Sequence, residues 1–137
     1  MFKLFNWDEK MSIDKDVIDD QHKTMMMSAN LLFESLSKGK SKDVIIGGIN
    51  CLRNYILEHF DYEIAYMKKH NYPALEEHLK SHEEFLNKYE EFLKRVKSKE
   101  VSGELAVEIY SFISNWFISH IENENIRYHD FWKNKEA

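Results

Sequence analysis

The chain has 137 residues, of which 19 are basic and 24 acidic, and its formal net charge is −5. Because the charges are intermixed and form no basic stripe, the composition argues against a nucleic-acid-binding protein. The single cysteine, Cys51, excludes an internal disulfide, and no apolar run approaches the roughly 20 residues needed to cross a bilayer.

The first predicted element, residues 1–13, is an N-terminal arm. Its sequence, MFKLFNWDEKM and onward, lacks the long apolar segment and cleavage site of a signal peptide, so we expect a cytoplasmic protein. We expect the arm to lie over the rest of the chain, anchored by Phe5 and Trp7. We expect the arm and a helical bundle over residues 14–132 to form a single domain, residues 1–137. A chain of this length can bury a hydrophobic core.

Residues 14–132 are predicted to form four helices. The whole chain has only 1 proline and 4 glycines, a scarcity that favours long helices, and polar breaks fall at 37–43, 70–74 and 97–104. Ser102 is a suitable N-cap for the last helix. Between the breaks, one set of positions, the seam, steps by threes and fours: Ile18, His22, Met25, Ala29, Leu32, Leu36; Ile45, Ile49, Leu52, Ile56, His59, Glu63, Tyr66; Leu75, His78, His82, Phe85, Tyr89, Phe92, Val96; Leu105, Ile109, Ile113, Trp116 and His120. Such spacing predicts an all-α, antiparallel up-down-up-down four-helix bundle.

Histidines interrupt the apolar seam. Five of the 7 histidines and one glutamate occupy seam positions where leucine would be expected: His22, His59, Glu63, His78, His82 and His120. One inward histidine is often a hydrogen-bonded core residue, but burying six such groups without partners would cost at least several kcal/mol. Antiparallel topology brings all six to one end of the bundle. A shared metal site there would satisfy them together.

The ligand types restrict the metal. Six nitrogen and oxygen ligands exceed the four of a closed zinc site, and zinc's favoured thiolates are absent from the seam. Calcium and magnesium prefer oxygen ligands, whereas imidazole with carboxylate suits iron, manganese or cobalt. The set is large enough for two ions, with Glu63 able to bridge them. Its richness in histidine favours reversible ligand binding over oxidation of strong C–H bonds.

Three stretches resemble the bacterial hemerythrins: IDDQHK (18–23), HFDYEIAYMKKHNYPALEEHLKSH (59–82) and WFISHIENENIRY (116–128). The resemblance extends from about Trp7 to Tyr128. It implies a non-haem diiron centre that binds dioxygen reversibly. We expect the protein to be a monomer that binds oxygen for storage, delivery or sensing and is not an enzyme.

The resemblance also implies a role for each ligand. His78, His82 and His120 would hold one iron ion, and His22 and His59 would hold the second and leave one coordination position open. Glu63 and an oxo or hydroxo group would bridge the two.

One position departs from the family pattern. The family has a bridging aspartate five residues after the last histidine, and this chain has Asn125 there, beside Glu124. On a regular helix the fifth residue points about 140° away from His120, so a ligand at that position requires a local distortion such as a π-bulge. Asn125 keeps the family register, whereas Glu124 would face the site on a straight helix and is the rival ligand.

Trp116 and Phe117 precede His120 by four and three residues, so we expect them to line the oxygen pocket. Two other classes of function remain open. The same scaffold could carry a diiron enzyme or iron-handling protein, for nitric oxide or peroxide reduction or for iron donation. It could also be a metal-free helical interaction module.

Overall fold

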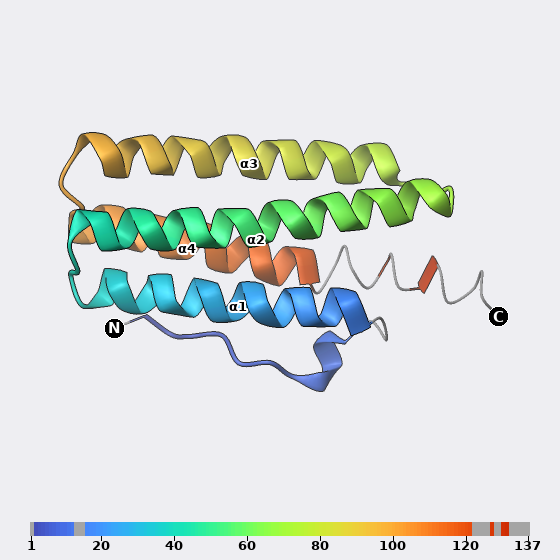
Figure 1. Ribbon diagram of the computed structural model, residues 1–137, viewed down its shortest axis with the longest axis horizontal. Helices are drawn as coiled ribbons and strands as arrows, with labels where there is room; N and C mark the ends of the chain where they lie inside the picture. Colours follow the sequence, from blue (N-terminus) through green and yellow to red (C-terminus); the bar gives the residue numbers. More distant parts are fainter. Residues whose placement is uncertain (1, 13–15, 122–126, 128–129, 132–137) are drawn as a thin grey trace.

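The fold is a bundle of four helices. The computed structural model describes residues 2–12, 16–121, 127, 130 and 131. The helices are α1 (Asp16–Ser37), α2 (Lys42–Lys69), α3 (Leu75–Ser98) and α4 (Gly103–Ser119), and a short 3₁₀ turn, η1 (Glu9–Met11), precedes them. Successive helices run in opposite directions side by side (Figure 1), and the described part of the chain contains no strand. The predicted antiparallel four-helix bundle is confirmed.

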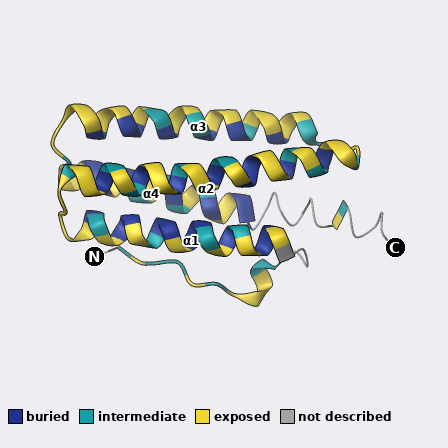
Figure 2. Ribbon diagram, viewed as in Figure 1, coloured by how far each residue is buried: buried dark blue, intermediate teal, exposed yellow. Residues whose placement is uncertain are grey.

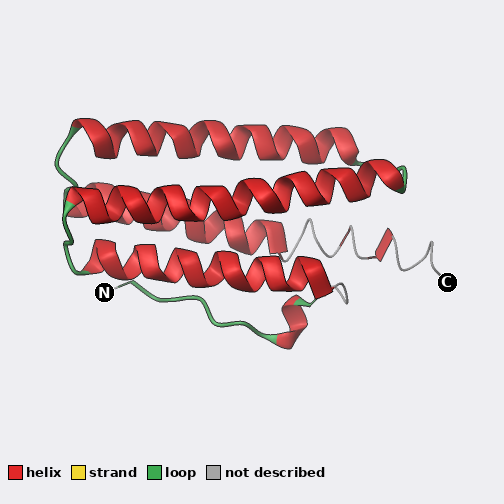
Figure 3. Cartoon of the chain, viewed as in Figure 1, coloured by secondary structure: helices red, strands yellow, loops and turns green. Residues whose placement is uncertain are grey.

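The helix ends lie at the predicted breaks, where short loops join the helices (Figure 3). Ser41 Oγ accepts a hydrogen bond from the backbone N–H of Val44 at 3.4 Å, and Ser102 Oγ accepts one from that of Leu105 at 3.0 Å. These two serines cap the N-termini of α2 and α4, as the sequence predicts for Ser102. None of the helices in the described ranges is long and apolar enough to cross a membrane.

The seam positions form the interior of the bundle. All of them are buried except Tyr66, Leu75 and Trp116, which are half-buried, and the buried faces of the helices point toward one another (Figure 2). Large side chains beside the seam complete the core: Phe33, Phe60, Met67 and Phe117. The bundle therefore places the seam histidines in its interior.

The N-terminal arm lies over α1 and α4. The backbone N–H of Phe5 donates to Asn30 Oδ1 at 2.7 Å, and Asn30 Nδ2 donates back to the Phe5 carbonyl at 2.9 Å. The Phe5 ring packs against Phe33 of α1 and Phe117 of α4, with centroids 5.7 and 5.2 Å apart. Trp7 lies beneath the ammonium of Lys23, 5.0 Å from its ring centroid. Both predicted anchors, Phe5 and Trp7, thus contact the bundle.

Candidate metal centre

The structure brings the six polar seam residues into one buried cluster. α1 supplies His22, α2 supplies His59 and Glu63, α3 supplies His78 and His82, and His120 directly follows α4. His22, His59, Glu63 and His120 are fully buried, and His78 and His82 are 5% and 4% exposed. We call this set the metal cluster. It lies in the half of the bundle nearest the α2–α3 turn, as the antiparallel topology predicts.

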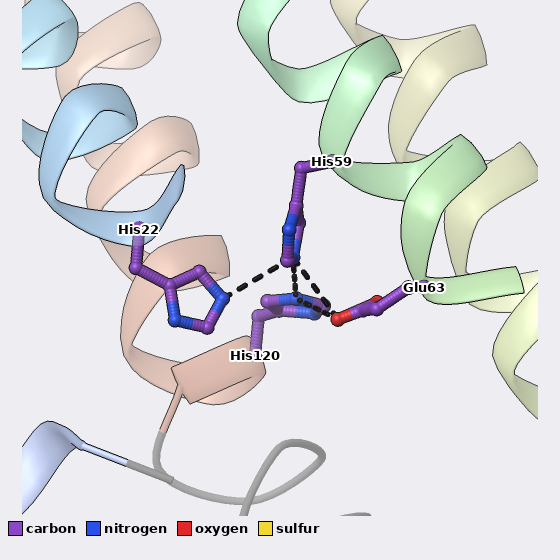
Figure 4. Close-up of side chains that lie close together, drawn as sticks. All are labelled: His22, His59, Glu63 and His120. Carbon is purple, nitrogen blue, oxygen red and sulfur yellow. Dashed lines mark hydrogen bonds and ion pairs between the residues drawn. The ribbon is translucent and has the colours of Figure 1, made fainter. Parts of the chain in front are cut away.

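The first half of the metal cluster consists of His22, His59, Glu63 and His120 (Figure 4). His59 Nε2 lies at its centre, 3.2 Å from Nε2 of His22 and 3.2 Å from Nε2 of His120. It is also 3.0 Å from Glu63 Oε2. Four ligand atoms from two helices, α1 and α2, and from the residue after α4 therefore point at one small volume.

The second half consists of Glu63, His78, His82 and His120. Glu63 Oε1 lies 2.7 Å from His78 Nε2 and 3.3 Å from His82 Nε2. His120 Nε2 lies 3.4 Å from the other carboxylate oxygen, Oε2. Glu63 thus directs one oxygen toward each half. His120, expected beside His78 and His82, lies within reach of both halves.

These distances fit metal ligands. Two ligand atoms about 2.1 Å from one ion and at right angles to each other lie about 3.0 Å apart. The nitrogen–nitrogen separations of 3.2 Å at His59 are close to that value. Hydrogen bonds alone do not satisfy the cluster, because Nε2 of the buried His82, the nitrogen that faces Glu63, has no hydrogen-bond partner among the described residues. The donor set therefore fits a bound cation.

The protonation states favour metal binding as well. Burial lowers the pKa of His22 well below its usual value, and His59 and His120 add to the effect. Burial also lowers the pKa of His82, to about 4. Burial alone would raise the pKa of Glu63, but His59 and His120 beside it bring it well below its usual value. Near neutral pH, His22 and His82 are therefore neutral and Glu63 is ionised, the forms that bind a metal.

Aromatic rings enclose the metal cluster. Phe60 stacks on His82 with centroids 3.6 Å apart and planes 4° apart, and Trp116 stacks on His120 at 4.6 Å and 15°. Phe117 contacts Trp116 at 5.2 Å but makes its other ring contact with Phe5 of the arm. Sequence reasoning missed Phe60, which lies beside the seam; the breadth of the apolar stripe on α2 was the available signal.

Asn125 and Glu124 lie outside the described residues. The segment just before them is described, and it is not a regular α-helix: His120 and Ile121 adopt π-helical geometry. A distortion of this kind at this place is what a ligand five residues after His120 requires. Which of the two side chains reaches the metal cluster remains a prediction.

Comparison with known proteins decides the family. The family model described as the hemerythrin HHE cation binding domain matches residues 14–131. The chain belongs to the hemerythrin family. It is 32% identical to the bacteriohemerythrin of Pseudomonas paraeruginosa over 124 residues, which cover 90% of this chain and 78% of the relative. Bacteriohemerythrins of Stenotrophomonas maltophilia and Methylococcus capsulatus are 27% and 26% identical, over 93% and 75% of this chain and 80% and 76% of theirs.

Membership of the hemerythrin family agrees with the sequence-based expectation of a metal-binding four-helix bundle. The matching model describes a cation-binding domain, and the metal cluster is where this chain offers ligands to a cation. The family model is described as a cation binding domain and the relatives are bacteriohemerythrins, in agreement with the expectation that the chain is a binding protein and not an enzyme.

Proposed function

We propose that the chain is a non-haem diiron protein that binds dioxygen reversibly, for storage, delivery or sensing. The observation that carries the proposal is the arrangement around Glu63, whose two carboxylate oxygens face two overlapping groups of imidazole nitrogens. One shared carboxylate with histidines on both sides suits a pair of ions. When bound, two ferrous ions supply the electrons with which dioxygen is held and released.

The metal cluster divides as the hemerythrin resemblance implies. His78, His82 and His120 would hold one ion, and His22 and His59 would hold the second, whose fewer protein ligands would leave room for dioxygen. Glu63 would be shared by the pair. The distances support this division, because His78 and His82 of α3 face Glu63 Oε1, whereas His59 of α2 faces Glu63 Oε2.

The surroundings of the metal cluster favour reversible binding. Trp116 lies against His120, and Phe117 is 1% exposed beneath the arm residue Phe5. Apolar rings exclude water, and a dry site would slow the delivery of protons to a bound ligand and so its irreversible loss. We therefore keep Trp116 and Phe117 as the proposed wall of the oxygen pocket.

We also propose Asn125 as the residue at the second bridging position, with Glu124 as the alternative. The π-helical geometry at His120 and Ile121 supports the more distant residue. A neutral amide in place of a carboxylate compensates less positive charge. We expect weaker retention of the second iron and a less favoured diferric state.

The test is anaerobic loading with ferrous iron, metal analysis, and optical spectra on adding and then removing oxygen. Two irons per chain and a spectrum that reverses on deoxygenation support the proposal. Rapid bleaching to a ferric product contradicts reversible binding and favours an enzyme, such as a nitric oxide or peroxide reductase, or an iron donor. Less than one iron per chain after loading contradicts the diiron assignment and favours a helical interaction module. A monomeric state and a cytoplasmic location remain predictions from the sequence.

A further inference from the structure

Gln21, which immediately precedes His22 on α1, contacts a different histidine. Its Oε1 lies 2.8 Å from Nδ1 of His59 on α2. Gln21 is half-buried and lines a surface cavity of about 320 Å³ between α1 and α2. The contact therefore joins two helices and links the outside of the bundle to a member of the metal cluster.

The chemistry of this contact determines the tautomer of His59. An amide oxygen can only accept a hydrogen bond, so Nδ1 of His59 carries the hydrogen and donates it to Gln21. A neutral imidazole has one N–H, so Nε2 keeps its lone pair. Nε2 is the atom that lies 3.2 Å from the Nε2 atoms of both His22 and His120. Gln21 thus holds His59 in the tautomer that can bind a metal.

We propose that Gln21 is a positioning residue for the metal position formed by His22 and His59, an inference that rests on the proposed function. Gln21 acts through the His59 ring, whose orientation and tautomer it sets, and does not touch the ions. The His22–His59 position therefore depends on Gln21.

The amide also sets the electronic character of His59. A carboxylate in the same place would draw the Nδ1 hydrogen more strongly, make Nε2 a more basic ligand and favour the ferric state. A neutral glutamine holds the ring without that effect. Gln21 therefore favours the ferrous state, which is the state that binds dioxygen reversibly.

Three variants separate these roles. Gln21→Leu removes the acceptor, Gln21→Glu keeps an acceptor of the same length, and Asn54→Leu makes the same kind of change at an exposed amide of α2. Anaerobic titration with Co²⁺, which suits the same imidazole and carboxylate ligands as iron, measures affinity without oxygen chemistry. Midpoint potentials of the iron-loaded proteins and circular dichroism complete the comparison.

In Gln21→Leu we expect one of the two Co²⁺ affinities to fall roughly 10- to 100-fold, the usual effect of losing a partner behind a metal-binding histidine. Gln21→Glu should keep that affinity and lower the midpoint potential. Asn54→Leu should match the wild type in both measurements.

Unchanged Co²⁺ affinities in Gln21→Leu would overturn the inference and leave the proposed function standing. Equal losses in Gln21→Leu and Gln21→Glu would show that His59 does not need an acceptor, which also overturns it. A wild-type protein that binds neither Co²⁺ nor Fe²⁺ would remove the proposed function itself, and the inference with it.

Discussion

At the scale of single residues, His78 makes the shortest contact with the shared carboxylate, 2.7 Å from Glu63 Oε1. We expect His78→Ala to lose iron and to melt at a lower temperature than the wild type, because metal binding to the native state adds to the free energy of folding. Metal analysis and thermal unfolding measure both effects.

His70 provides the control. It follows the last residue of α2, and its ring lies 4.3 Å from that of Tyr66, outside the metal cluster. His70→Ala should keep its iron. Equal iron content in His78→Ala and the wild type would contradict the ligand assignment.

Phe117 tests the oxygen pocket. It is 1% exposed, so Phe117→Ala should destabilise the fold by about 3–5 kcal/mol, and by admitting water it should also speed the decay of the oxygenated form. Iron content should not change. Optical spectra followed over time measure the decay.

Phe92→Ala is the matched control for Phe117→Ala. Phe92 is 7% exposed in α3, ten residues beyond His82 and away from the metal cluster. Its replacement should lower stability without changing the decay rate. If Phe117→Ala also leaves the decay unchanged, the pocket wall lies elsewhere, and Trp116, which stacks on His120, is the next residue to replace.

At this scale the residues of the metal cluster could be predicted from the sequence, whereas the side chains that contact them from outside the cluster could not. The cluster residues stand out because a charged or polar residue on a helical seam is costly to bury, so His59 and Glu63 are visible from spacing alone. Gln21 and Phe60 lie on the flanks of their helices. Their contacts depend on the rotation of α1 and α2 about their own axes relative to the neighbouring helix. Side-chain packing determines this rotation, and the spacing of apolar residues does not predict it.

At the scale of helices, the π-helical geometry at His120 and Ile121 bears on the missing carboxylate. A π-bulge inserts one residue into a helical turn, so a residue five positions after His120 would take the direction that the fourth has on a straight helix. We therefore expect Asn125→Asp to raise the iron content per chain and to lengthen the lifetime of the oxygenated form, since a negative bridge compensates the charge of two ions.

Glu124→Gln is the paired variant, and on this hypothesis it should change neither the iron content nor the lifetime. If Asn125→Asp changes neither quantity and Glu124→Gln loses its iron, Glu124 is the ligand and the hypothesis is wrong.

Helix boundaries were predictable because each break carries its own chemistry, such as the Ser102 cap and the polar run at 37–43. The width of the buried face of each helix was not predictable in this way. Positions spaced by three and four residues follow a single line along the helix, whereas the apolar stripe of a packed helix covers at least about 100° of its circumference. Phe33 and Met67, both fully buried, fall in that wider stripe.

At the scale of the whole molecule, buried neutral histidines make the metal-free fold sensitive to acid. The pKa of His82 is lowered from its ordinary 6.5 to about 4 in the folded state. Between these two pH values His82 is therefore protonated in the unfolded chain and neutral in the folded chain. Stability is complete above about pH 6.5 and falls progressively toward pH 4, by about 3 kcal/mol from this residue. Lowered pKa values at His22 and Glu63 act in the same direction.

Urea unfolding of the metal-free protein between pH 7.5 and pH 4.5 measures this loss. His82→Gln, which cannot take up a proton, should show a shallower dependence on pH than the wild type. Identical dependence in the two proteins would mean that His82 is not held neutral by burial.

The arm described above has a consequence for the order of folding. Tyr110 of α4 donates a hydrogen bond to the Lys3 carbonyl at 2.8 Å, across 107 residues of sequence, and Phe5 packs on Phe117 of the same helix. Contacts so distant in sequence carry a large loop-closure entropy and form after the local helix pairs. The first residues of the chain therefore dock only when α4 is in place. Because His120 directly follows α4, docking of the arm and completion of the metal cluster both require that helix, and we expect the protein to become able to bind metal late in folding.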